Sequence, residues 1–340
     1  MLSILVGILL IMLLFCFLSM LIKKFIPSAF KFQNMWLSHH DFLNVVERNW
    51  QAPVFPNNNI SGMVRLWNNL SRLKQVLRWW KKHIFKDLFA NIKNAENEVL
   101  ELGKACQINL DSSNFVELNV AKINLITLQE QEEIYWHQKA TTKIMVDGDR
   151  NTKFFHALAN KKKIRNHIFK ISTDDGRVLD EEESILNSGV EHFKNIFNSG
   201  FVSSNMINSH IVPSCISEAD NLFLTMSPSD DEVWKVMQEM NMDFVAGPDG
   251  FTTKFFIKTW NITKKDIMEA VSEFFSGKPH IKFFSSTNIV LIPNKEATNN
   301  WMILDLLVYA PFLINLSLRS LLLDLLIFFP ELSLKIKLVL

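Results

Sequence analysis

The chain has 340 residues, 48% of them apolar, and a formal net charge of +1 at pH 7. That length allows two modest domains with a sizeable core, and the balanced charge excludes a protein that binds nucleic acid over its whole surface. The three cysteines lie far apart, without a CxxC pair or a Cys/His cluster, which argues against a zinc module or a disulfide scaffold and indicates a reducing compartment.

The N-terminal segment 1–24 is apolar. Its first 22 residues carry no charge and include eight leucines, and Lys23 and Lys24 follow them. A helix of about 20 apolar residues can cross a membrane, and two lysines after it favour a cytoplasmic side for the rest of the chain. The segment therefore predicts a membrane anchor. The alternative is that the segment is an out-of-frame translation.

Apolar side chains recur three or four residues apart from Leu66 to Ile92, which predicts a helix. A polar break with cap candidates Asp111, Ser112 and Ser113 separates it from a second helix over 115–139. Two helices joined by a short polar turn predict an antiparallel hairpin within 60–140. The second helix is expected to turn one apolar side inward: Leu118, Ile123, Ile126 and Ile134. The tryptophans are expected in the core or in contacts: Trp67, Trp79, Trp80 and Trp136.

The segment from Arg150 to Lys170 holds seven Lys or Arg and no acidic residue. Asp147, Asp149 or Asn151 could cap a helix that begins near Thr152, with an apolar side made by Phe154, Phe155 and Leu158. Such a basic cluster holds phosphates by Coulomb attraction and counterion release, without reading sequence. The alternative is a solvated helix end whose cations complement the helix dipole.

Beyond the basic segment the pattern becomes mixed. Two short strands are expected around Asp174–Gly176, and another helix is expected to be capped by Ser229 or Asp230. Between them a helix is expected over 181–197, with these side chains inward: Ile185, Val190, Phe193 and Ile196. Gly247, Pro248, Asp249 and Gly250 form a turn motif, because Pro248 presets its φ and the glycines allow positive φ. A Phe-rich helix over 253–275 and a strand over 288–293 follow. The fold class is mainly α with a few short β-strands (α+β).

The sequence offers no catalytic constellation. His39, His40 and Asp41 lack further ligands at helical or loop spacing, so we expect no metal site there. Phosphate-binding loops, GxSxG elbows and HExxH motifs are absent from the sequence. Adjacent aspartates in an apolar hairpin, which a two-metal polymerase needs, are absent as well. We therefore expect no catalytic residue, no metal, no cofactor and no small-molecule substrate.

Four segments, in this order, resemble the polyprotein of plant non-LTR (LINE-type) retrotransposons. FKFQNMWLSHHDFLNVVERNW resembles the junction after the endonuclease, and GDRNTKFFHALANKKKIRNHI resembles the connector that precedes the polymerase. AGPDGFTTKFFIKTW resembles the Ala-Pro-Gly-Pro-Asp-Gly-Phe pattern with its aromatic helix. FFSSTNIVLIPNKE resembles the first strand of the reverse-transcriptase fingers.

The resemblance implies RNA or single-stranded DNA as the partner of the basic segment. The residues carried over as backbone contacts are Arg150, Lys153, Lys161, Lys162, Lys163 and Arg165. Lys295 would lie near the incoming nucleotide or the template. The family polymerase uses Mg²⁺, whose palm ligands are absent here, so the chain is not an enzyme as it stands. Family resemblance also implies the nucleus or the cytoplasm, and the membrane only if residues 1–22 act as an anchor.

The sequence also departs from the family pattern at several positions. Phe244, Val245 and Ala246 replace the usual Lys-Ala-Pro, and the Asp-Phe-Arg-Pro-Ile-Ser-Leu strand expected after Glu296 is missing. The endonuclease and palm motifs are missing too. We therefore interpret the Leu-rich ends as out-of-frame translations, which translation of the flanking DNA in the other frames would test. A fingers strand without its palm is expected to lack a pairing partner.

Three hypotheses remain open: a catalytically inactive relic, a module that still binds nucleic acid, and a single-pass membrane protein of unrelated role. Salt-dependent binding and fractionation of a tagged chain would separate them. The expected divisions are an apolar segment 1–24, a post-endonuclease junction 25–59, a helical hairpin 60–140, a basic connector 141–225, the start of incomplete reverse-transcriptase fingers 226–298, and a Leu-rich tail 299–340.

Overall fold

The protein is described by a computed structural model that covers residues 29–54, 59–108, 112–140, 152–173, 175–198, 217–242, 246–279, 282–284, 286–293, 300–301 and 304–328. The helical elements are η1 (Asn34–Ser38), α2 (Phe42–Gln51), α3 (Gly62–Trp80), the π turn η2 (Lys81–Phe85), α4 (Leu88–Ile108), α5 (Ser112–Ala140), α6 (Thr152–Arg165), α7 (Glu182–Asn198), α8 (Glu218–Thr225), α9 (Asp230–Glu239), α10 (Thr253–Lys258), α11 (Trp260–Phe275) and α12 (Phe312–Phe328). The strands are β1 (Ile171–Ser172), β2 (Val178–Leu179), β3 (Asn288–Pro293) and β4 (Leu304–Tyr309).

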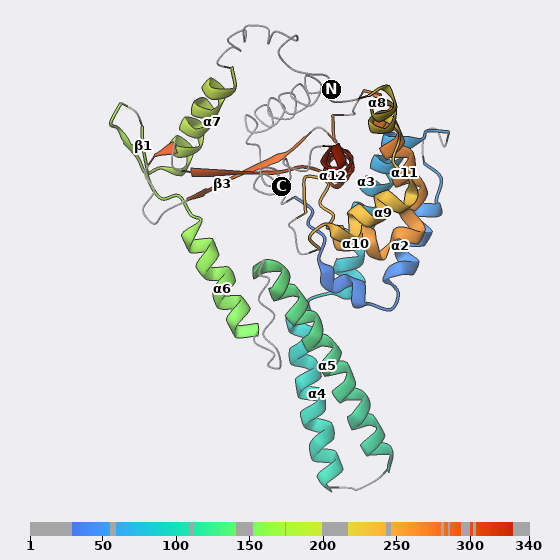
Figure 1. The fold of residues 1–340 in the computed structure, drawn as a ribbon. Helices are drawn as coiled ribbons and strands as arrows, with labels where there is room; N and C mark the ends of the chain where they lie inside the picture. Colours follow the sequence, from blue (N-terminus) through green and yellow to red (C-terminus); the bar gives the residue numbers. More distant parts are fainter. Residues whose placement is uncertain are drawn as a thin grey trace.

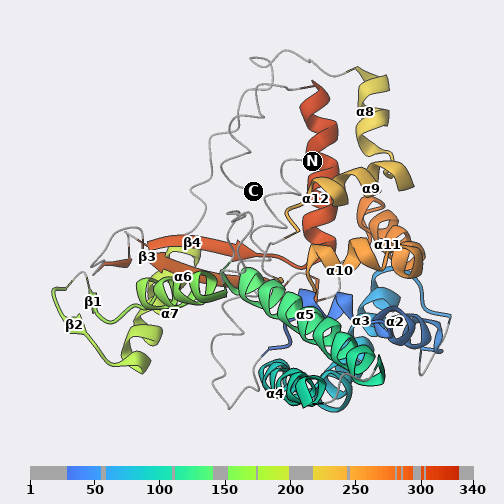
Figure 2. The same ribbon diagram turned by 90° about the horizontal axis from the view of Figure 1, so that it is seen from below.

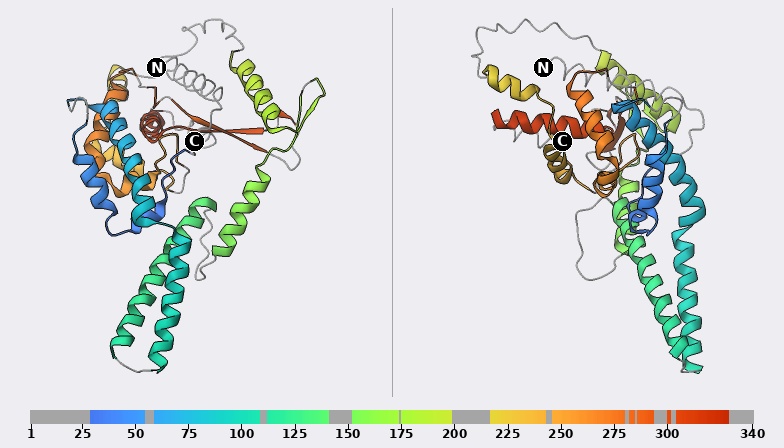
Figure 3. Two further views of the ribbon diagram at one scale, coloured as in Figure 1. Left: turned by 180° about the vertical axis from the view of Figure 1, so that it is seen from behind. Right: turned by 90° about the vertical axis from the view of Figure 1, so that its right-hand side faces the viewer.

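The helices α2, α3 and α9 to α12 gather into one helical body, from which the hairpin of α4 and α5 projects (Figure 1). The views from behind and from the side show the same projection (Figure 3). In the described residues the strands make two antiparallel pairs, β1 with β2 and β3 with β4. The sequence-based prediction of a mainly α protein with a few short strands is confirmed.

The main core is built around aromatic side chains close to the start of the described chain. Phe32 packs edge-on against Trp36, with ring centroids 5.2 Å apart, and lies 5.1 Å from Phe255. Trp80 at the end of α3 contacts Trp36 and Phe42. All five rings are almost fully buried. This aromatic cluster joins η1, α2 and α3 to α10, and its burial favours the fold because large apolar surfaces leave water.

A polar contact orients α3 against α11 inside this body. Asn69 donates to Asp266 at 2.7 Å, and Arg65 pairs with the same carboxylate at 3.2 Å. At the first turn of α3, Glu273 accepts from the backbone N–H of Met63 at 2.7 Å. An acidic side chain on free N–H groups at a helix N-terminus stabilises the helix through both hydrogen bonding and the macrodipole.

A second, smaller core contains Ile171, Ile185 and Trp301. The indole N–H of Trp301 donates to Ser188 on α7 at 3.1 Å, and Gly189 on the same helix leaves room for the ring. The β3–β4 ladder extends from the helical body toward α7 and β1 (Figure 2). The ladder therefore connects the two cores.

The helices that form the projecting hairpin differ from those predicted. The apolar period runs on past Leu77, but the chain leaves the helix at η2, and Lys86 has φ 61° and ψ −151°. The hairpin therefore consists of α4 and α5, whereas α3 belongs to the helical body. The expected apolar side of α5 is wrong in part, because Ile123 is 65% exposed. Ile126 is exposed as well.

Three further expectations are corrected. The Phe-rich helix is interrupted at Thr259, which ends α10 and precedes α11. The strand β3 does have a partner, because all six of its residues pair with β4. Ile196 on α7 is exposed rather than inward. By contrast, Ser229 caps α9 as predicted, with a reciprocal bond to Glu232.

No helix in the described part of the chain is both long and apolar enough to cross a membrane. The predicted anchor in residues 1–22 lies outside the described residues.

Replacing Gly250 by Ala is expected to lower the free energy of unfolding by about 3 kcal/mol, because φ is +77° and a Cβ would stand 2.5 Å from the carbonyl oxygen of Phe30. Gly176 is a matched control, with φ +81° and open space around its Cβ. Its replacement by Ala is expected to cost about 1 kcal/mol. Equal losses in chemical denaturation would contradict the tight contact at Gly250.

Candidate nucleic-acid interface

The basic segment forms α6, which begins at Thr152, as predicted, and ends at Arg165. Its cap candidates lie outside the described residues. Phe155 is buried and meets the ring of His137 on α5, with centroids 5.5 Å apart. The next residue, His156, contacts Trp136 on α5 with ring centroids 4.5 Å apart. These contacts fix one side of α6 against the C-terminal third of α5, so its other side faces solvent.

The predicted contact residues separate into two groups. Lys153, Lys161, Lys163 and Arg165 are exposed. Lys162 is half-buried, and its ammonium donates to the carbonyl of Ala140 at 2.6 Å, the last residue of α5. A cation at a helix C-terminus satisfies a free carbonyl and complements the dipole. Lys162 therefore ties α6 to α5, whereas its neighbours keep their charges in water. Arg150 and Lys295 lie outside the described residues.

The exit of α6 adds aromatic surface to these charges. The rings of His167 and Phe169 lie 4.3 Å apart, and Phe169 is 64% exposed. Cations beside an exposed ring suit a single-stranded nucleic acid, because phosphates attract the charges and bases stack on the ring. The geometry of α6 and its exit therefore suits the binding of a single-stranded nucleic acid.

The turn motif Gly247–Gly250 forms the expected turn, closed by a bond from the N–H of Gly250 to the carbonyl of Gly247 at 2.9 Å. Asp249 is buried and accepts from the N–H of Phe312 at 2.6 Å. The carbonyl of Gly250 accepts from Phe32 at 2.8 Å. The motif therefore joins the segment before η1 to the start of α12, which is a structural role.

Burial raises the pKa of Asp249 to about 6, although the backbone N–H of Phe312 and the charge of Lys74 oppose the shift. A carboxylate in an apolar environment loses hydration, which favours its protonated form. Among the described residues, no group of three or more His, Cys, Asp and Glu lies close enough together to hold a metal ion.

A second cationic cluster was missed by the sequence-based reasoning. Arg78, Lys81, Lys82 and Lys86 line one pocket at the junction of α3 and α4. The run RWWKKHIFK carries the signal, since it holds four Lys or Arg and no acidic residue in nine positions. The signal was hidden because the helical period places these cations on the polar side of an ordinary helix.

Comparison with known proteins gives a distant relative. No family model matches the chain. Over 298 residues, 85% of its length, the chain is 23% identical to the transposon TX1 uncharacterized 149 kDa protein of Xenopus laevis. The chain is similar to a transposon-encoded protein. It spans 23% of that relative's length, so the likeness concerns one part of a much longer polypeptide.

The buried carboxyl of Asp249 predicts a pH dependence of stability. Because its folded pKa lies above the ordinary value, the folded chain holds this proton more tightly than the unfolded chain between about pH 4 and pH 6. The contribution of Asp249 to the free energy of unfolding should therefore fall by about 2–3 kcal/mol as pH rises from 4 to 7.

The measurement compares the chain with its Asp249→Asn variant by denaturant unfolding at each pH. Asn cannot ionise there, so the difference between the two curves isolates this group from other carboxylates. A difference that stays constant across this pH range would contradict the burial of an ionisable Asp249.

Proposed function

We propose that the chain is the connector and the start of the fingers of a non-LTR, LINE-type retrotransposon reverse transcriptase, inactive as it stands. The observation that carries the proposal is the transposon relative matched along 85% of the chain. The four resembling segments follow one another in family order from Phe30 to Glu296. As its remaining activity we propose that it holds RNA or single-stranded DNA through α6.

The charge distribution on α6 supports nucleic-acid binding. Lys153, Lys161, Lys163 and Arg165 are exposed and supply the charges, and no acidic residue occurs from Arg150 to Lys170 to neutralise them. Phosphate contacts of this kind position a strand without reading its sequence. A polymerase also needs two metal ions on palm carboxylates to activate the primer hydroxyl. The chain offers no such pair in its sequence, which supports binding without catalysis.

The genetic code supports the proposed out-of-frame origin of the tail. One DNA string that would encode Ile303 to Tyr309 is ATT TTA GAC CTA TTA GTC TAT. Read one base earlier, from the final G of the Met302 codon ATG, it becomes GAT TTT AGA CCT ATT AGT CTA. That string encodes Asp-Phe-Arg-Pro-Ile-Ser-Leu, the strand that the family resemblance leads us to expect after Glu296. Loss of one base near Met302 would account for the departure.

The proposed frame change predicts individual codons. Leu304 and Leu307 must be encoded by TTA, Asp305 by GAC and Leu306 by CTA, because other codons would change the shifted peptide. Sequencing the gene over Met302 to Tyr309 tests this directly. A different codon at any of these four positions would contradict the loss of one base near Met302. It would not affect the proposal that α6 binds nucleic acid.

The binding proposal predicts that Lys161, Lys163 and Arg165, changed together to Glu, weaken binding of oligouridylate by about tenfold or more at low salt. Each lost phosphate contact on a single strand lowers the slope of log affinity against log salt by about 0.7, so the slope should fall by about 2. Lys162 is left unchanged because it holds α5. Filter binding at several salt concentrations measures both quantities.

A matched control changes the exposed lysines Lys104, Lys122 and Lys265 to Glu, which alters the net charge equally on other helices. The control should retain most of the affinity, and circular dichroism should show the same helix content in all three chains. Equal losses in both variants would mean that only overall charge matters. Absence of binding by the unaltered chain at low salt would leave an inactive relic.

A further inference from the structure

A pocket of about 490 Å³ lies where α3 gives way to α4, apart from the contacts of α6. Four cationic side chains line it, together with Gln33, Met35, Asp87, Leu88, Phe89 and Tyr135. The cations are Arg78, Lys81, Lys82 and Lys86, and all four are exposed. Of the two walls, one is the end of α3 with its π turn, and the other includes Tyr135 on α5.

Lys86, the residue that follows the π turn, is held in an unfavourable backbone conformation. The N–H of Lys86 donates to the carbonyl of Lys81 at 2.8 Å, which closes the wide turn. Lys86 then has φ 61° and ψ −151°, a region that glycine occupies easily and other residues rarely. Phe85 and Leu88 are buried on either side of it. Packing of Phe85 and Leu88 holds Lys86 in a backbone conformation that lysine disfavours.

Strain of this kind at a lysine calls for an explanation, because glycine would fit the backbone better. Strained residues cluster at ligand-binding positions, where the surrounding structure holds them. The π turn itself ends α3 and is of a kind that occurs at helix C-termini. Here the strained conformation places a fourth cation on the pocket wall. The π turn and the positive φ are observations independent of the charge count.

The lining of the pocket carries more positive than negative charge, because it holds four cations and one acidic side chain. Asp87 is the acidic residue in the lining, and its carboxylate accepts from the N–H of Phe89 at 2.9 Å at the first turn of α4. Arg78 lies 5.8 Å from the ring of Phe30, a cation–π contact that leaves its charge uncompensated. The four cations therefore create a positive potential that an anionic ligand can neutralise.

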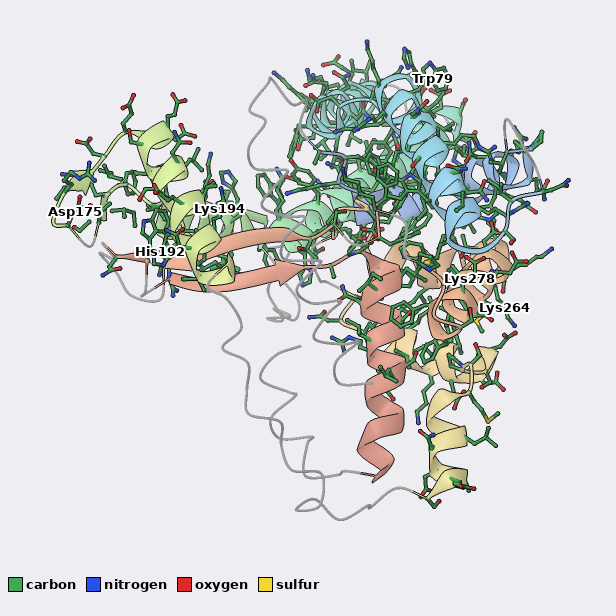
Figure 4. All side chains as sticks on the ribbon, turned by 90° about the horizontal axis from the view of Figure 1, so that it is seen from above. Trp79, Asp175, His192, Lys194, Lys264 and Lys278 are labelled. Atoms are coloured by element: carbon green, nitrogen blue, oxygen red, sulfur yellow. The ribbon has the colours of Figure 1, made fainter. Side chains whose placement is uncertain are left out.

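Aromatic rings stand beside these charges. Trp79, on the same turn as Arg78, is 57% exposed and stacks on His83 with centroids 4.7 Å apart. It lies at the outer edge of the molecule, far from Asp175 at the opposite end (Figure 4). An exposed tryptophan next to a cationic groove is the combination that holds single-stranded nucleic acids, because phosphates pair with cations while bases stack. An acidic peptide would use the charges but not the ring.

We propose that this pocket is a second binding site for single-stranded nucleic acid, with phosphates among Arg78, Lys81, Lys82 and Lys86 and a base stacked on Trp79. The ligand class rests on the function proposed above, but the residues are separate from those of α6. Trp136 on α5 connects the two regions, since its ring contacts Phe89 at 6.0 Å and His156 on α6 at 4.5 Å. The pocket and α6 therefore both adjoin the same turn of α5.

The sharpest test is Lys86→Gly, measured in the full chain. Glycine relieves the backbone strain, so thermal unfolding should shift upward by a few degrees. The same change removes one phosphate contact, so the salt slope for oligouridylate binding should fall by about 0.7, with weaker affinity at low salt. A chain that becomes more stable and binds less cannot be explained by damage to the fold.

Two companion variants address charge and stacking separately. Lys81→Glu with Lys82→Glu should weaken binding about tenfold or more, whereas Lys104→Glu with Lys122→Glu should not. Trp79→Ala should lower affinity about fivefold or more and leave the salt slope unchanged, because stacking carries no counterion release. Binding by all three pocket variants equal to that of the unaltered chain would overturn the second site.

The outcomes distinguish this site from the one on α6. Loss of binding in the α6 variant alone overturns the pocket and leaves the proposed function standing. Loss in the pocket variants alone supports the pocket and overturns the role given to α6. Displacement of the oligouridylate by polyglutamate as effectively as by unlabelled RNA would overturn the nucleic-acid assignment in favour of a general anion site.

Discussion

The structure depends on one buried turn, Gly247–Gly250, that holds together parts of the chain distant in sequence. Asp249 accepts a hydrogen bond from the N–H of Phe312, and the carbonyl of Gly250 accepts one from the N–H of Phe32. Around these bonds lie the rings of Phe251 and Phe255. Without the turn, the segment before η1 and the first turn of α12 would lose their polar anchor. The aromatic cluster would then lack one of its walls.

The cost of this arrangement is a carboxyl group removed from water. Asp249 accepts backbone N–H bonds and feels the charge of Lys74, yet burial dominates and raises its pKa. Hydrogen bonds from backbone groups are worth more inside a protein than in water, so the group can remain although its ionised form is disfavoured. The turn thus exchanges some stability for a fixed geometry at the centre of the helical body.

Local chemistry made much of the fold predictable. Ser229 and Glu232 form their capping box within four residues, and α6 begins and ends where its composition changes. The break at Lys86 could not be predicted, because the apolar period continues through it and its backbone conformation depends on packing of Phe85. The burial of Asp249 was equally hidden, since its partner lies sixty-three residues further along the chain. The candidate contacts on α6 were predictable as a charge run, but the role of Lys162 needed the position of Ala140.

The pairing of β3 with β4 bears on how far the side chains of a strand can change while its backbone pairing is kept. Ladder hydrogen bonds join backbone groups, so a strand can close a sheet edge with any side chains of suitable polarity. On the proposed frame change, every side chain after Met302 was replaced at once, yet the new residues are largely apolar and β4 still covers β3. On that proposal, β3 is paired along one edge by residues that were not selected for this pairing.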